Sequence, residues 1–143
     1  MTEHSPILAP IVALIAWSLV MWLWMYATRI PAMSAARIDT MNLVGGSGAE
    51  LKAIIPPKAQ WPADNYNHLM EQPTLFYAVA LVLALLGQGG GVNLTIAWAY
   101  VGLRVVHSLV QATVNRVIIR FSIFVLATLC LIALTLHAAI AVF

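Results

Sequence analysis

The sequence predicts an all-α integral membrane protein, a single domain over residues 1–143 whose four transmembrane helices form an antiparallel bundle. Composition is the first reason: 62% of the residues are hydrophobic and 8% are charged, against roughly 45–50% apolar and about 25% charged residues in soluble domains. The second reason is that four apolar segments reach or approach the roughly 20 residues that a membrane-spanning helix needs. The third is that two of the three connections are short, which favours antiparallel neighbours.

The first predicted helix covers about residues 7–29 and contains the run ILAPIVALIAWSLVMWLWMYAT. This run is longer than the apolar core of a secretory signal, which has about 7–15 residues, and no A-x-A site closes it. We therefore expect a retained transmembrane helix. Aromatic residues near its end fit an interfacial belt. They are Trp22, Trp24 and Tyr26.

A long polar loop is predicted next, over about residues 31–64, because the stretches GGSG and PPKAQWP disfavour a long helix. The second transmembrane helix is predicted over about residues 66–87. Pro73 lies inside it, lacks a backbone N–H and disfavours helical geometry at Gln72, so we expect a kink or a helix start there.

The last two predicted helices cover about residues 94–113 and 117–142. The uncharged turn GQGGGVN precedes the third helix, and a short link near Asn115 precedes the fourth. The length of these apolar runs and their lack of alternation argue against strands.

Basic residues predict the orientation. Four of them lie in or beside the first loop: Arg29, Arg37, Lys52 and Lys58. The third connection is flanked by Arg116 and Arg120, whereas the second connection and the C-terminal end have no Lys or Arg. The positive-inside rule then places the first and third connections in the cytoplasm and both termini outside.

A stripe of polar residues marks the third predicted helix. Its members follow the spacing i, i+3, i+4, i+7, which places them on one helix face. They are Arg104, His107, Ser108 and Gln111. An arginine at membrane depth costs at least ~2.5 kcal/mol, so this face should line a protein interior or a water-filled cavity.

Glu71 is the one acidic residue at the edge of a predicted span, and its expected partner is an arginine of the third helix, Arg104. Other interpretations stay open. The pair could be purely structural, His107 could be a hydrogen-bonded histidine within the bundle, and Arg116 and Arg120 could be interfacial anchors.

Several classes of function find no support. Seven Lys and Arg residues give little basis for nucleic-acid binding, and the single Cys130 allows no disulfide within one chain. No Cys/His set has zinc-ligand spacing, so no metal site is predicted. The glycine runs lack the lysine and the strand context of a phosphate loop.

Two segments, NHLMEQPTLFYA and GLRVVHSLVQATVNRVIIRF, together resemble the MAPEG superfamily, the membrane-associated proteins in eicosanoid and glutathione metabolism, and above all its little-characterised bacterial branch. The resemblance covers roughly residue 65 to the C-terminal end. It implies four helices per subunit, a homotrimer in the bacterial inner membrane, and glutathione bound between subunits near the cytoplasmic face. A lipophilic small molecule would arrive from the lipid bilayer.

The resemblance also implies roles for individual residues. Arg120 would stabilise the thiolate as the catalytic residue. The residues that would bind glutathione are Asn67, Glu71, Arg104, His107, Gln111 and Arg37. The chain departs from the family pattern in three places: Asp64 stands where basic residues often precede the Asn, the Asn-to-Glu spacing is four and not three, and Gln111 replaces a frequent Tyr.

Two hypotheses about function follow. In the first, the protein is a glutathione-dependent transferase or peroxidase that acts on lipophilic electrophiles. In the second, it is a non-catalytic membrane protein or a structural subunit of a larger membrane assembly, and the polar stripe only ties helices together.

Overall fold

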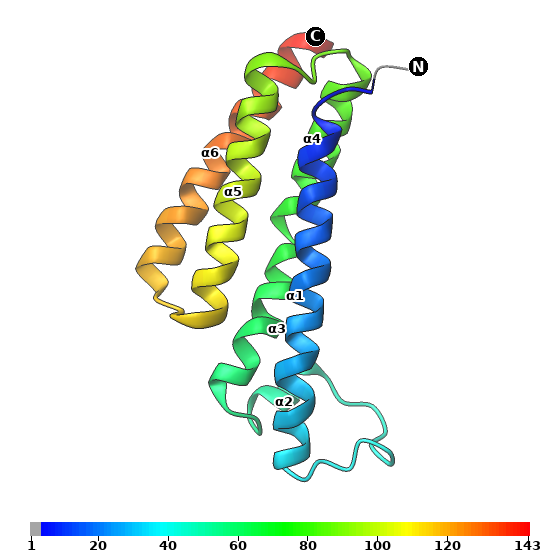
Figure 1. Cartoon of the computed structure of the whole chain (residues 1–143), viewed down its shortest axis with the longest axis vertical. Coiled ribbons are helices and arrows are strands. Elements are labelled where there is room, and N and C mark those ends of the chain that lie inside the picture. The colour runs from blue at the N-terminus through cyan, green and yellow to red at the C-terminus, as the bar shows by residue number, and fades with distance from the viewer. Residues whose placement is uncertain (1–3) are drawn as a thin grey trace.

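The computed structural model describes residues 4–143, which contain six helices and no strand. The helices are α1 (Leu8–Ala35), α2 (Gly48–Lys52), α3 (Pro57–Leu69), α4 (Gln72–Leu85), α5 (Gly91–Thr113) and α6 (Val117–Val142). Figure 1 shows α3 and α4 following each other as one rod beside α1, with α5 and α6 as a second pair. The start of α1 and the end of α6 lie at one end of the molecule, and α2 lies at the other.

Three helical stretches of the described chain are long and apolar enough to cross a membrane. They are Leu8–Ala35, Pro57–Leu85 and Val117–Val142. The fourth expected span corresponds to α5, which is long enough with 23 residues but has too low a mean hydropathy to join them. The polar stripe lowers that mean, and its side chains are buried inside the protein.

The loop expected over residues 31–64 is shorter in the structure, because helix occupies both of its ends. Pro31 does not end α1, which continues to Ala35. The helix stops where Arg37 takes a left-handed conformation (φ 53°). There Arg37 N donates to Ser34 O (3.1 Å) and Ile38 N donates to Met33 O (3.2 Å), the bonding pattern of a Schellman motif.

Local signals also explain the helices at the far end of this loop. Ser47 and Glu50 form a reciprocal capping box that starts α2. Pro57 is the first residue of α3, a position where its missing N–H costs nothing. Between α1 and α2, the Asn42 side-chain amide donates to the Asp39 carboxylate (2.7 Å) and lowers the pKa of that carboxyl group.

The break expected before Pro73 is present. Helix α3 ends at Leu69 and α4 begins at Gln72, with Glu71 between them at φ −90° and ψ −95°. Since Pro73 has no N–H, the helical ladder cannot continue through this point. At the break the carbonyl oxygen of His68 accepts a backbone bond from Glu71 N (3.3 Å) and has a second lone pair for a donor from another helix.

Three helices meet in the core around Tyr100 of α5. Its ring stacks on Phe76 of α4, with centroids 4.5 Å apart. Its hydroxyl group donates to Gln72 Oε1 (3.2 Å), and Gln72 Nε2 donates to Thr128 Oγ1 of α6 (2.9 Å). This chain of hydrogen bonds fixes α4, α5 and α6 relative to one another just beyond the helix break.

At the end of the molecule opposite α2, hydrogen bonds link α6, α5 and the turn before α5. His137 Nδ1 lies 2.6 Å from Asn93 Oδ1, and Asn93 Nδ2 donates to the Gln88 carbonyl (2.9 Å). In the turn between α4 and α5, a side chain at Gly89 would collide with Ser5 and Ile7. The segment before α1 therefore covers this turn.

Candidate functional site

The polar stripe of α5 faces the interior of the protein, as its spacing predicts. All four of its side chains are buried, and Arg104 is 0% exposed. Helix α5 packs against α6, α3 and α1, so the stripe has protein on several sides. The interior position agrees with the high cost of exposing an arginine to lipid.

Arg104 is anchored by His68 at the end of α3. Its Nη2 lies 2.8 Å from His68 Nδ1 and donates a longer bond of 3.4 Å to the His68 carbonyl oxygen. The remaining guanidinium atoms, Nε and Nη1, are buried and have no hydrogen-bond partner among residues 4–143. The guanidinium group also lies 5.9 Å from the centre of the Phe124 ring.

Two imidazole rings lie face to face beside this guanidinium group. The rings of His68 and His107 are stacked with centroids 4.8 Å apart and planes 13° apart. Phe124 of α6 presents its ring to His68 at 5.5 Å and 64°. The three rings come from three helices, and together they form one wall of a cavity.

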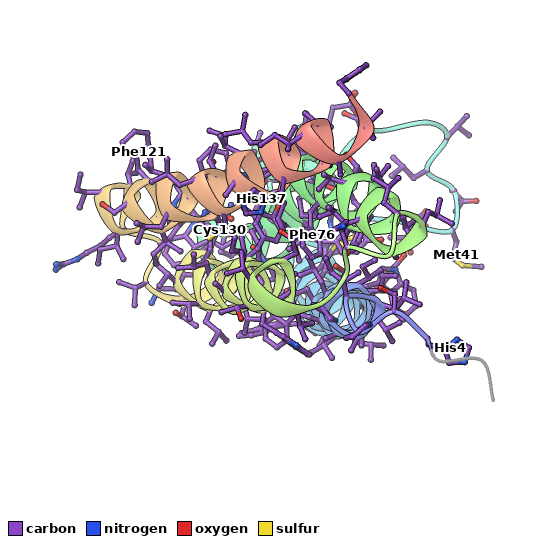
Figure 2. The ribbon with its side chains drawn as sticks, turned by 90° about the horizontal axis from the view of Figure 1, so that it is seen from above. His4, Met41, Phe76, Phe121, Cys130 and His137 are labelled. Atoms are coloured by element: carbon purple, nitrogen blue, oxygen red, sulfur yellow. The ribbon has the colours of Figure 1, made fainter. Side chains whose placement is uncertain are left out.

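That cavity has a volume of about 220 Å³. Its lining comes from α3, α5 and the first two turns of α6. The residues are His68, His107, Val117, Arg120, Phe121 and Phe124. Phe121, on the outer side of α6, marks this end of the helix in Figure 2. The volume falls below the roughly 300–1,000 Å³ that is usual for small-molecule sites, so a single chain encloses only part of a larger ligand.

The cavity is positively charged. Arg104 stands behind its histidine wall and Arg120 lines it directly. In the part of the chain that the structure describes, the only ion pair joins Lys52 of α2 and Asp64 of α3 (3.2 Å). No carboxylate of the described residues forms an ion pair with Arg104.

The expected ion pair between Glu71 and Arg104 is therefore wrong. Glu71 lies in the helix break and its side chain is exposed. Arg104 takes the ring nitrogen and the carbonyl oxygen of His68 in place of the carboxylate. The break places Glu71 outside both helices, with its side chain exposed.

The other residues predicted from sequence lie apart from this cavity. Asn67 is exposed and lines a separate cavity with Lys52 and Asp64. Arg37 is exposed and closes α1. Gln111 is buried one stripe position beyond Ser108, and its Oε1 has no partner within residues 4–143. Of the predicted set, the structure gathers Arg104, His107 and Arg120.

Sequence reasoning missed His68 and Phe124. A signal existed for each. His68 precedes Glu71 by three residues, the spacing that the resembled family uses for its Asn, whereas Asn67 precedes it by four. Phe124 follows Arg120 by four residues and so shares its helix face.

An apolar groove of about 630 Å³ runs between α4 and α6. Gln72 and Thr128 line it at the end nearest the histidine cavity. These two residues follow His68 and Phe124, which line the cavity, by four residues each, across the helix break in the first case and within α6 in the second. The groove and the cavity thus follow each other along the α3–α4 rod and α6.

A sequence model described as the MAPEG family matches residues 7–140, nearly the whole chain. No curated protein and no solved structure gives a significant match.

The exposed position of Glu71 predicts how two neighbouring substitutions differ. Glu71→Gln should change the free energy of unfolding by no more than about 0.5 kcal/mol, because an exposed surface charge is lost. Gln72→Leu should cost about 1–3 kcal/mol, because the buried polar partners of Gln72 on α5 and α6 lose their bonds. Thermal unfolding in detergent measures both. A loss of about 3–5 kcal/mol in Glu71→Gln would contradict the exposed position of Glu71 and support a buried ion pair with Arg104.

Proposed function

Because the chain belongs to the MAPEG family, we propose that it is a glutathione-dependent transferase or peroxidase that acts on lipophilic electrophiles. One observation carries this proposal: Arg104 is fully buried beside a cavity, and no carboxylate of residues 4–143 pairs with it. A buried charge without a counter-ion is costly. An anionic ligand would supply the missing charge.

Glutathione suits this environment chemically. It carries two carboxylates and a thiol, and arginine side chains bind carboxylates through paired hydrogen bonds. Arg120 lines the cavity, where a cation favours the thiolate over the thiol. The thiolate is the nucleophilic form, so Arg120 is the proposed catalytic residue. Arg104 and His107 are the proposed binding residues nearest to it.

The second substrate would approach through the groove between α4 and α6. That groove is lined mainly by apolar side chains, and its polar residues Gln72 and Thr128 lie four residues along the chain from His68 and Phe124 of the histidine cavity. A lipophilic electrophile dissolved in the bilayer could enter from the side and meet the thiolate at the cavity. The transferred group would then form a bond to sulfur while its leaving group departs.

The small cavity volume supports an assembly of several copies. A homotrimer, in which α1, the α3–α4 rod, α5 and α6 of each chain form an antiparallel bundle across the bacterial inner membrane, would let a neighbour complete the ligand site. Exposed Asn67, Glu71 and Arg37 could then contact glutathione or another copy. Mass measurement in mild detergent tests this: we expect three chains per particle, and an active monomer would contradict it.

The enzyme hypothesis predicts a sharp difference between two arginines of α6. Arg120→Gln should lower the rate of conjugation of glutathione to an aromatic chloride electrophile about 100-fold, because one cation at the sulfur is lost. Arg116→Gln is the matched control, since Arg116 is exposed and precedes α6. Steady-state kinetics of the purified protein measure both. Wild type without activity toward any thiol would favour the non-catalytic hypothesis.

The orientation prediction is that both termini face the outside of the cell. The start of α1 and the end of α6 lie at the same end of the molecule (Figure 1). The connections that carry the basic residues lie at the opposite end. Reporter fusions after Gly90 and at Phe143 should both give periplasmic signals. A cytoplasmic signal from either fusion contradicts this orientation.

A further inference from the structure

The contact between Arg104 and His68 determines where His68 carries its proton. A guanidinium group has only donors. At 2.8 Å from Arg104 Nη2, His68 Nδ1 must therefore be the acceptor and hold no hydrogen. A neutral imidazole with a bare Nδ1 carries its hydrogen on Nε2. Nε2 forms no hydrogen bond within the described residues, and the ring lines the cavity.

Neighbouring groups keep His68 in this form. Its ring faces Arg104 and His107 of α5 and Arg120 and Phe124 of α6. A second proton on Nδ1 would place two positive groups in direct contact and break the bond to Arg104. The nearest carboxylate along the chain, Glu71, is exposed.

We propose that His68, held by Arg104, donates its Nε2 hydrogen to the sulfur anion of the bound thiol ligand. This inference rests on the proposed function and specifies how the site holds the thiolate. The cavity of about 220 Å³ suits the thiol end of the ligand, and Arg120 lines it together with His68. His68 is then a ligand-binding donor, and Arg104 is its positioning residue.

The same tautomer excludes His68 as the base that removes the thiol proton. Its Nε2 already holds a hydrogen, and its Nδ1 is occupied by Arg104. The proton must leave to water on the open side of the cavity, while the electron pair stays on sulfur. The thiolate fraction should therefore rise through a single ionisation, that of the thiol itself.

The geometry distinguishes His68 from its neighbours. Asn67 is one residue earlier, about 100° around the helix, and lines a different cavity. His107 is stacked on His68, but its Nδ1 is buried without a partner among residues 4–143, so nothing there fixes its tautomer. His68 alone combines an anchored nitrogen with a free one in the cavity wall.

Two substitutions separate the roles of the two ring nitrogens. In His68→Asn, the amide oxygen can take the place of Nδ1 and still accept from Arg104, but the Nε2 donor is lost. In His68→Gln, the longer amide can place an N–H near the position of Nε2. Met70→Ala is the control, because Met70 is exposed at the end of α3 and lines neither cavity.

The readout is the ultraviolet absorbance of the thiolate of bound glutathione, followed against pH. We expect His68→Asn to lower the thiolate fraction about tenfold at a given pH below the thiol pKa. His68→Gln should retain most of it, and Met70→Ala all of it. Affinity for S-methyl glutathione, which has no thiol, should stay within about threefold in each variant.

The possible outcomes are distinct. If wild type forms the thiolate and folded His68→Asn forms it equally well, the role of His68 is overturned and the proposed function stands. If wild type binds no glutathione, both fail. Nitrogen NMR of isotope-labelled wild type tests the tautomer without any variant: a hydrogen on Nδ1 of His68 would overturn the proposal.

Discussion

The contact between Arg104 and His68 organises this protein. A guanidinium group buried among apolar helices must find acceptors, and Arg104 finds a ring nitrogen and a carbonyl oxygen on the same residue. That carbonyl group lies where the α3–α4 rod is broken, and it accepts from Glu71 N as well as from Arg104. One interaction thus joins α5 to the broken rod, orients the histidine wall and leaves positive charge at the cavity.

The same interaction explains why hydropathy and packing give different views of α5. Its stripe of polar residues lowers the mean hydropathy below that of the three apolar spans, yet these residues are the buried ones. In a membrane protein, polar and charged side chains are costly to expose to lipid, so they lie inside the bundle, where other helices offer hydrogen-bond partners. The outer faces of α1, α4 and α6 carry the exposed apolar residues that suit contact with lipid or with another copy.

Features local in the sequence were sufficient to predict the helical class, the inward stripe of α5 and the break before Pro73: the length of the apolar runs, the spacing of the polar residues and the proline itself. They were insufficient for contacts between helices. Whether Arg104 contacts Glu71 or His68 depends on how α3 and α4 are rotated about their axes. The break between the two helices changes that rotation. Asn67 and His68 are neighbours in the sequence but lie on different faces of α3. The sequence analysis chose Asn67 as the ligand-binding residue, whereas His68 is the one that lines this cavity. The start of α3 at Pro57 was missed because proline was taken as a breaker and not as a first helical residue.

The close packing of Ser5 and Ile7 over Gly89 has a consequence for biogenesis. These residues are synthesised before the turn that they contact, which leaves the ribosome only after α1, α2, α3 and α4 have been made. Contacts between such distant parts of a chain are slow to form. The contact of Ser5 and Ile7 with the α4–α5 turn should therefore form late in the assembly of the protein.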